Sequence, residues 1–147
     1  DIKSNKKLKL SKLSYGDDLG SEHENYITKK HDTGVFVTHW PMDIKSFYMK
    51  QCDDGTCESF DLLIPYGIGE LIGASQREDS YKKLSTMMDI KGINKYNMEF
   101  YLDLRKYGSC PHGGFGLGVD RLLMLVTGIS NIKDVIPFPV YYKNCKF

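Results

Sequence analysis

The sequence of 147 residues is long enough for one domain of ordinary size and too short for two. Hydrophobic residues make up 41% of it and charged residues 27%, which is typical of a globular chain and excludes a disordered or fibrous one. The 20 lysines and arginines nearly balance the 19 aspartates and glutamates. The chain therefore lacks the basic field of a protein that binds nucleic acid by charge alone.

The first residues are rich in lysine, and the predicted elements begin after them. Residues 1–14 are expected to form a linker or the remnant of an insertion, with solvated lysines. A short helix that contains Glu22 and Glu24 is expected within residues 16–31. Residues 35–38 combine valine, phenylalanine and threonine, and this composition predicts a strand.

The middle of the chain has the pattern of antiparallel strands. Residues 44–50 and 58–64 predict the two arms of a hairpin, with a turn at residues 53–55. Residues 65–69 predict a second turn because proline and glycine gather there. Residues 70–77 predict a further strand.

Helical patterns dominate the later part of the chain. Apolar residues recur at helical spacing over residues 78–91, and Gly92 follows where a helix would end. A second helix is predicted over residues 97–107. A strand at 113–119 and an apolar helix at 120–127 follow. These elements predict an α+β fold, an antiparallel β-sheet flanked by helices.

The cysteines and the apolar runs indicate the cellular compartment in which the chain is expected. The four cysteines, Cys52, Cys57, Cys110 and Cys145, form no C-x-x-C pair and have no histidine at zinc-ligand spacing. Free thiols in a reducing compartment are therefore predicted, with a hairpin disulfide between Cys52 and Cys57 as the alternative. No signal peptide and no membrane-length apolar run is apparent. A cytoplasmic protein is expected, or an organellar one if a targeting segment precedes this sequence.

The segment GFGLGVDR, residues 114–121, has glycine at every second position. Because strand side chains alternate between faces, one face there is bare backbone. Glycine is costly inside a strand, so a close approach is expected, and a flat ring system is a natural candidate. Arg121 could stack its guanidinium on that ring. Tight packing of another element is the alternative, whereas a dinucleotide loop does not fit the G-x-G-x-G spacing.

Several segments together carry a resemblance. They are residues 35–41 (VFVTHWP), 44–49 (IKSFYM), 69–78 (GELIGASQRE), 101–108 (YLDLRKYG), 114–124 (GFGLGVDRLLM) and 134–139 (DVIPFP). The glycine segment resembles the third signature motif of class II aminoacyl-tRNA synthetases, with aspartate in place of the usual glutamate. The whole set, in one register over residues 15–147, resembles the asparaginyl-tRNA synthetases of the aspartyl/asparaginyl subgroup.

The resemblance implies an ATP site at the glycine strand. Arg121 would match the arginine that stacks on adenine. Gly118, Val119 and Asp120 would line the ATP site beside it. Glu70 would face the ATP phosphates.

The resemblance also implies a metal and an amino-acid site. Glu70, with Asp61 as its partner, would hold a Mg²⁺ on the phosphates, in keeping with the preference of Mg²⁺ for carboxylate and phosphate oxygens. Arg77 would recognise the side-chain carbonyl of the amino acid with its rigid donor fork. Gly73 would contact the substrate through its backbone. Glu70, Arg77 and Arg121 would thus be the residues that carry catalysis.

Other residues near these segments have less specific expectations. Lys45 and Tyr48 would line the site, whereas Ser75 is given no catalytic role. His112 is expected to be structural, because an attack by the substrate's own carboxylate needs positioning and charge stabilisation more than a base.

The implied activity is asparagine–tRNA ligation. ATP and asparagine would form asparaginyl-adenylate, and the aminoacyl group would pass to tRNA(Asn), in an enzyme that is a homodimer when complete and has no membrane part. An aspartyl-tRNA synthetase is the nearest alternative, because an arginine fork suits aspartate as well. A paralogue that amidates aspartate without tRNA and a non-catalytic interaction module are the others.

The sequence departs from the family pattern in two ways. Tyr66 is an insertion in the turn between Asp61 and Glu70, which puts the pairing of these two acids in question. The family's first two motifs and its anticodon-binding barrel do not occur in the chain. Residues 15–147 are therefore expected to be the C-terminal half of the catalytic domain and to be inactive alone.

The strand at residues 70–77 carries one geometric expectation. Glu70 and Arg77 are an odd number of residues apart, so strict alternation would place them on opposite faces of the sheet. Both would need to face ligands on the same side. A β-bulge between them, near Ile72 and Gly73, is therefore predicted.

Overall fold

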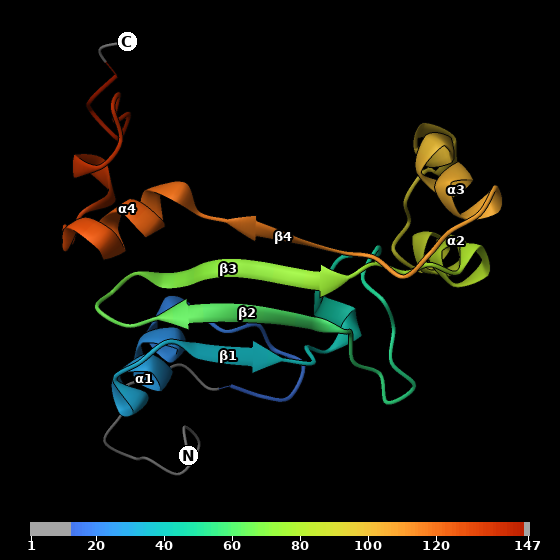
Figure 1. Cartoon of the computed structure of the whole chain (residues 1–147), viewed down its shortest axis with the longest axis horizontal. Coiled ribbons are helices and arrows are strands. Elements are labelled where there is room, and N and C mark those ends of the chain that lie inside the picture. Colours follow the sequence, from blue (N-terminus) through green and yellow to red (C-terminus); the bar gives the residue numbers. More distant parts are fainter. Residues whose placement is uncertain (1–12, 146–147) are drawn as a thin grey trace.

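The computed structural model describes residues 13–145, and these residues form a four-stranded antiparallel sheet. Its strands are paired in chain order (Figure 1): β1 (Val35–Thr38), β2 (Ser59–Ile64), β3 (Gly69–Gln76) and β4 (Gly113–Leu117). The α+β fold expected from the sequence is thereby confirmed. Of the predicted linker, residues 1–12 lie outside the described part of the chain.

Helices flank both ends of the sheet (Figure 1). They are α1 (Ser21–His31), α2 (Tyr81–Ile90), α3 (Glu99–Lys106) and α4 (Val119–Thr127), with short 3₁₀ turns at η1 (Met42–Ile44), η2 (Lys95–Met98) and η3 (Ile132–Asp134). The α2–α3 pair stands at one end of the sheet, and α1 and α4 lie towards the other. Ser80 caps α2 by accepting from the backbone N–H of Lys83, and Gly128 ends α4 in the left-handed conformation that glycine favours.

Two small apolar cores hold these elements together. The first joins α4 to the β2–β3 hairpin and consists of Ile64, Ile68, Leu71 and Met124. The second lies inside the α2–α3 pair and consists of Leu84, Met88 and Leu102. The sheet and the helical pair therefore have separate cores, and polar contacts described below connect the pair to the end of β3.

One arm of the predicted central hairpin is not a strand. Residues 44–50 contain the end of a 3₁₀ turn and then a bridge between Met49 and Arg77. Only the tip of the predicted hairpin forms, where Gln51 bridges Cys57 around the predicted turn and the backbone N–H of Glu58 donates to the carbonyl of Lys50 at 3.0 Å. The rest of this arm is not a strand because a strand has only two edges. β2 pairs with β1 on one edge and with β3 on the other, so residues 44–50 have no free edge to join.

The predicted bulge in β3 is present. Leu62 lies opposite Ile72 and Leu63 lies opposite Glu70, which leaves Leu71 as an extra residue between them. The bulge lies one residue before the expected position, because the side chain of Leu71 belongs to the core beneath α4. The extra residue returns Glu70 to the face of the sheet that also carries Gly73.

Candidate active site

One face of the sheet gathers most of the predicted site residues. The strand register places Asp61, Gly73 and Gly116 in one row across β2, β3 and β4. The next row consists of Ser59, Ser75 and Gly114. Since cross-strand neighbours share a face, the two rows form a floor of small residues with an acid at its edge.

The two acids, Asp61 and Glu70, meet above Gly73. A Cβ atom at Gly73 would lie 2.7 Å from Oε1 of Glu70 and 3.4 Å from Oδ1 of Asp61, so glycine leaves the room that the carboxylates occupy. Burial raises the pKa of Glu70, and the negative charge of Asp61 raises it further, while Lys45 and Arg121 oppose the shift. The two neighbouring carboxylates therefore make this corner of the sheet favourable for binding a cation.

Lys45 already supplies one positive charge at this corner. Its Nζ lies 2.9 Å from Oδ2 of Asp61 and 4.2 Å from the centroid of the Trp40 ring. Both partners of the ion pair are largely buried, with exposed side-chain fractions of 17% for Lys45 and 11% for Asp61. Lys45 thus lies beside Asp61, and a loop carries it rather than the strand that the sequence predicted.

Tyr66 does not separate the two acids. It lies in the turn between β2 and β3, with 73% of its surface exposed and a φ angle of 66°. Tyr66 therefore lies away from the acids, and Asp61 and Glu70 stay together above Gly73.

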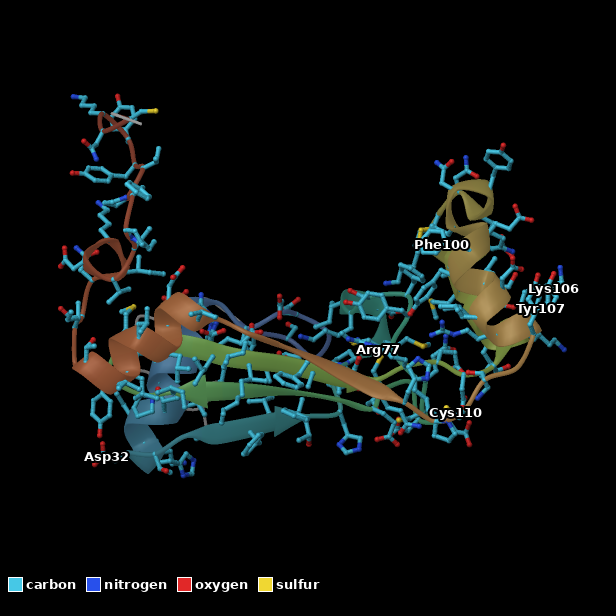
Figure 2. The ribbon with its side chains drawn as sticks, turned by 45° about the horizontal axis from the view of Figure 1, so that its top comes forward. Asp32, Arg77, Phe100, Lys106, Tyr107 and Cys110 are labelled. Atoms are coloured by element: carbon cyan, nitrogen blue, oxygen red, sulfur yellow. The ribbon has the colours of Figure 1, made fainter. Side chains whose placement is uncertain are left out.

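Arg77 lies at the other end of the floor, next to the α2–α3 pair (Figure 2). Its NH1 group donates to Oγ of Ser75 at 2.6 Å, and its Cζ lies 4.7 Å from the centroid of the Tyr48 ring. Its backbone N–H donates to the carbonyl of His112 at 2.8 Å. Beneath it lies Gly114, where a Cβ atom would approach NH2 to 2.6 Å.

Arg121 lies in the first turn of α4 and reaches back to the acidic corner. Its NH1 group donates to the backbone carbonyl of Glu70. The aliphatic part of its side chain packs on Gly118, with Cδ 3.5 Å from the position of a Cβ atom there. Val119 and Asp120 open the helix immediately before it.

The structure thus sorts the predicted residues into two groups. Asp61, Glu70 and Arg121 form an acidic corner with Gly73 and Gly118 beneath it. Arg77 forms the second group with its own supports. Both groups belong to one continuous sheet floor.

Sequence reasoning missed two residues of this arrangement. Glu24, on α1, has a raised pKa, first because of burial and then because of the charge of Glu70. Its Oε2 lies 3.0 Å from the Cβ position of Gly69, and no local pattern could have placed that helix there. Ser75 was expected to have no catalytic role, and the contact by which its hydroxyl accepts from Arg77 was not predicted.

His112 has structural partners. Its Nδ1 lies 2.9 Å from the carbonyl of Cys110, and its Nε2 lies 3.3 Å from NH2 of Arg105. Arg105 is itself buried and donates from Nε to the carbonyl of Glu78 at 3.0 Å. These contacts connect α3 to the end of β3, in agreement with the structural interpretation of His112.

An antiparallel sheet with a glycine floor, an acidic corner and two arginines on one face is the arrangement expected of a class II synthetase catalytic core. Residues 3–141 match the family model described as tRNA synthetases class II (D, K and N). The chain therefore belongs to the class II tRNA synthetases.

Comparison with individual proteins is more specific than the family match. The chain is 53% identical over 135 residues to the asparagine–tRNA ligase of Phocaeicola vulgatus, which covers 90% of this chain and 29% of that protein. The asparaginyl-tRNA synthetase of Entamoeba histolytica in complex with asparaginyl-adenylate is 38% identical with a TM-score of 0.85, over 90% of this chain and 31% of that one. The aspartyl-tRNA synthetase of the same organism is 28% identical with a TM-score of 0.79, over 88% and 28%.

These matches cover only part of each relative. The chain spans about a third of the length of the relatives it matches. Within residues 13–145, no helix is long and apolar enough to cross a membrane.

Proposed function

We propose that this chain is part of an asparagine–tRNA ligase, with residues 15–147 as the C-terminal part of its catalytic domain and residues 1–14 as a linker. The observation that carries the proposal is the identity of 53% to a curated asparagine–tRNA ligase over nearly the whole chain. The two Entamoeba histolytica structures support the choice of amino acid, because identity is 38% to the asparaginyl enzyme and 28% to the aspartyl enzyme.

The proposed reaction proceeds in two steps. A carboxylate oxygen of asparagine forms a bond to the α-phosphorus of ATP, pyrophosphate leaves, and asparaginyl-adenylate results. The terminal ribose hydroxyl of tRNA(Asn) then attacks the activated carbonyl and releases AMP. The first step needs no general base, because the nucleophile is already an anion, so alignment and charge stabilisation are what the sheet floor would supply.

The two groups of side chains divide the ligands between them. Arg77 would donate to the side-chain carbonyl of asparagine, with Gly73 allowing close approach through its backbone. Arg121 would stack its planar guanidinium on adenine, with Gly118, Val119 and Asp120 beside the ring. Arg77 and Arg121 would thus bind the two ends of one adenylate, the asparagine side chain and the adenine ring.

Mg²⁺ is the implied metal, and the residues present fit it. Glu70 and Asp61 supply two carboxylates above Gly73, and the raised pKa of Glu70 indicates a position that a cation relieves. Among residues 13–145 no group of three or more acidic, histidine or cysteine side chains could hold a metal alone. Mg²⁺ keeps several waters and binds substrate phosphates, so two protein carboxylates would be enough for it. When bound, it would neutralise charge on the ATP phosphates.

Partners and compartment follow from the proposed family role. Asparagine, ATP and tRNA(Asn) would be the substrates of the complete enzyme, which we expect to be a cytoplasmic homodimer, or an organellar one if a targeting segment precedes this sequence. An aspartyl-tRNA synthetase is the second candidate, favoured by the TM-score of 0.79 to such an enzyme. An arginine fork donates to a carboxylate as readily as to the carbonyl oxygen of an amide.

A chimeric enzyme tests the proposal. In the chimeric ligase, this chain replaces the 135 matched residues of the Phocaeicola vulgatus protein. We expect asparagine-dependent exchange of pyrophosphate into ATP, and a loss of about 10- to 150-fold in kcat/KM for Arg77→Ala, since a charged hydrogen bond is worth about 1.5–3 kcal/mol. Lys82→Ala, on an exposed part of α2, is the matched control and should leave the rate unchanged.

Each other outcome has a definite meaning. Exchange that depends on aspartate instead of asparagine would leave the aspartyl-tRNA synthetase and the paralogue that amidates aspartate, and transfer of aspartate to tRNA would separate these two. A folded chimeric ligase with no exchange for either amino acid would leave a non-catalytic module. The isolated 147-residue chain should show no exchange above background.

A further inference from the structure

Arg77 is held by residues from three separate segments of the chain. Ser75 lies two residues before it on β3, Tyr48 comes from the loop after β1, and Gly114 lies on β4. Ser75 and Tyr48 contact the guanidinium group, and Gly114 leaves the space that the group occupies. Fixing the long side chain of an arginine costs rotamer entropy, which such contacts must offset.

Gly114 determines the space that the guanidinium occupies. A Cβ atom at this position would lie 2.6 Å from NH2, 3.2 Å from Nε and 3.3 Å from Cζ of Arg77. The next glycine on the same face, Gly116, has no atom within 4 Å of its Cβ position. The alternating glycines therefore do two different things. Gly114 makes room for an arginine of the same chain, and Gly116 leaves open floor.

Ser75 fixes the rotation of the guanidinium. Its Oγ accepts from NH1 at 2.6 Å, and Ser75 is 5% exposed, so the bond is shielded from water. Hydrogen bonds to a charged donor are among the stronger ones in proteins. Ser75 and Gly114 are direct partners in the β3–β4 ladder, so the acceptor and the open space lie side by side.

Tyr48 supports the guanidinium with its ring. The distance of 4.7 Å from Cζ to the ring centroid is within the range of a cation–π contact. Two contacts hold Tyr48 in turn. Its carbonyl accepts from the backbone N–H of Glu78 at 2.9 Å, and its ring packs edge-on against Phe47 at 5.3 Å.

We propose that Ser75, Tyr48 and Gly114 are positioning residues that fix Arg77 for two-point recognition of a planar amide or carboxylate. The inference rests on the proposed function, in which Arg77 binds the amino-acid side chain. Ser75 uses one of the five donors of the guanidinium, and the others stay in a plane that the ring and the glycine define. The three residues act on the substrate only through Arg77.

The test separates the affinity for the amino acid from the affinity for ATP. In the chimeric ligase, Ser75→Ala, Tyr48→Leu and Gly114→Ala should each raise KM for asparagine about tenfold. KM for ATP should change less than about twofold. Tyr48→Phe keeps the ring and should retain the KM of the parent. A general loss of structure would raise both constants, and thermal unfolding of each variant checks that it is folded.

The remaining outcomes overturn the proposal in distinguishable ways. If Arg77→Lys raises KM for asparagine but the folded Ser75→Ala and Tyr48→Leu variants do not, the positioning role is wrong and the proposed function stands. If Arg77→Lys itself leaves KM for asparagine unchanged, Arg77 does not bind the amino acid, and both proposals fail at this residue. Equal increases in KM for asparagine and ATP would also contradict positioning.

Discussion

Arg121 is the residue on which the adenine assignment depends. In the chimeric ligase, Arg121→Ala should raise KM for ATP by about 3- to 30-fold, because a cation stacked on a ring contributes about 0.5–2 kcal/mol. KM for asparagine should change little. Arg121→Lys keeps the charge but loses the planar group, so it should restore only part of the affinity. An increase in KM for asparagine with unchanged KM for ATP would show that Arg121 serves the other ligand.

Glu70 gives the metal assignment a test that needs no catalysis. Its pKa is raised above the ordinary value of 4.5, first by burial and then by Asp61. The folded chain therefore binds this proton more tightly than the unfolded chain does. The resulting contribution to stability is fully present below about pH 4.5 and is lost as the pH rises through the raised pKa.

Two expectations follow for the thermal unfolding of the isolated chain. Glu70→Gln should raise Tm at pH 7 without metal, and the gain should shrink as the pH falls towards 4.5. Millimolar MgCl₂ should raise Tm of the parent chain and not that of the variant, since a cation that binds only the folded state stabilises it. Equal responses of the two proteins to MgCl₂ would place the metal elsewhere.

At the scale of elements, the connection of the α2–α3 pair to the sheet depends on Arg105. This buried side chain donates to the carbonyl of Glu78 and, through NH2, to the hydroxyl of Tyr101 at 3.1 Å. Arg105→Leu should weaken this docking by about 2 kcal/mol, the value of a charged hydrogen bond.

Limited proteolysis measures that docking. A loss of about 2 kcal/mol corresponds to cleavage about thirty times faster in the turn at residues 92–98, if the pair opens as one unit. Lys106→Leu, on the exposed side of the same helix, is the matched control. Unchanged cleavage in Arg105→Leu would mean that the small apolar core of α2 and α3 holds the pair in place by itself.

Comparison of the predicted helices and strands with the structure shows which signals in the sequence were sufficient. Helical spacing and glycine stops located α2 and α4 well, because both signals are local. The bulge in β3 followed from the parity of Glu70 and Arg77, but its position depended on the packing of Leu71. The strand predicted at residues 44–50 had good local composition, but both edges of its expected partner β2 are occupied by β1 and β3. Competition for edges is a property of the whole sheet.

The site could be predicted to a similar extent. Asp61, Glu70 and Arg121 are brought together as the resemblance implied. The place of Glu24 beside Glu70 could not be predicted from the sequence, because it depends on how α1 packs against the sheet. The role of Gly114 could not be predicted for a different reason. The alternating glycines are equivalent in sequence, and only the coordinates show which one lies beneath a side chain.

At the scale of the whole molecule, the face of the sheet opposite the site is apolar and exposed. Phe36 and Leu117 lie in one row of the ladder, and Phe60 and Phe115 lie in the next. Phe36 is 60% exposed and Phe115 is 71% exposed. Exposed apolar patches of this kind drive association.

The isolated chain should therefore associate as its concentration rises. Light scattering should show a mass well above 16.8 kDa in the tens of micromolar range, and Phe115→Thr should reduce it. Tyr96→Thr, at an exposed aromatic residue near α3, is the comparison and should have little effect. A monomer at all concentrations would show that this face is compatible with water as it stands.

Because of its position, Trp40 should report on this site through its fluorescence. Trp40 is the only tryptophan of the chain, it is 6% exposed, and the ammonium group that lies 4.2 Å from its ring is the same one that pairs with Asp61. A divalent ion that takes Asp61 competes with Lys45 and shifts the charge beside the indole. Titration of the chain with MgCl₂ should thus change the intensity of its fluorescence emission, with a saturating curve that yields a dissociation constant. The same titration of Asp61→Asn should give a flat line.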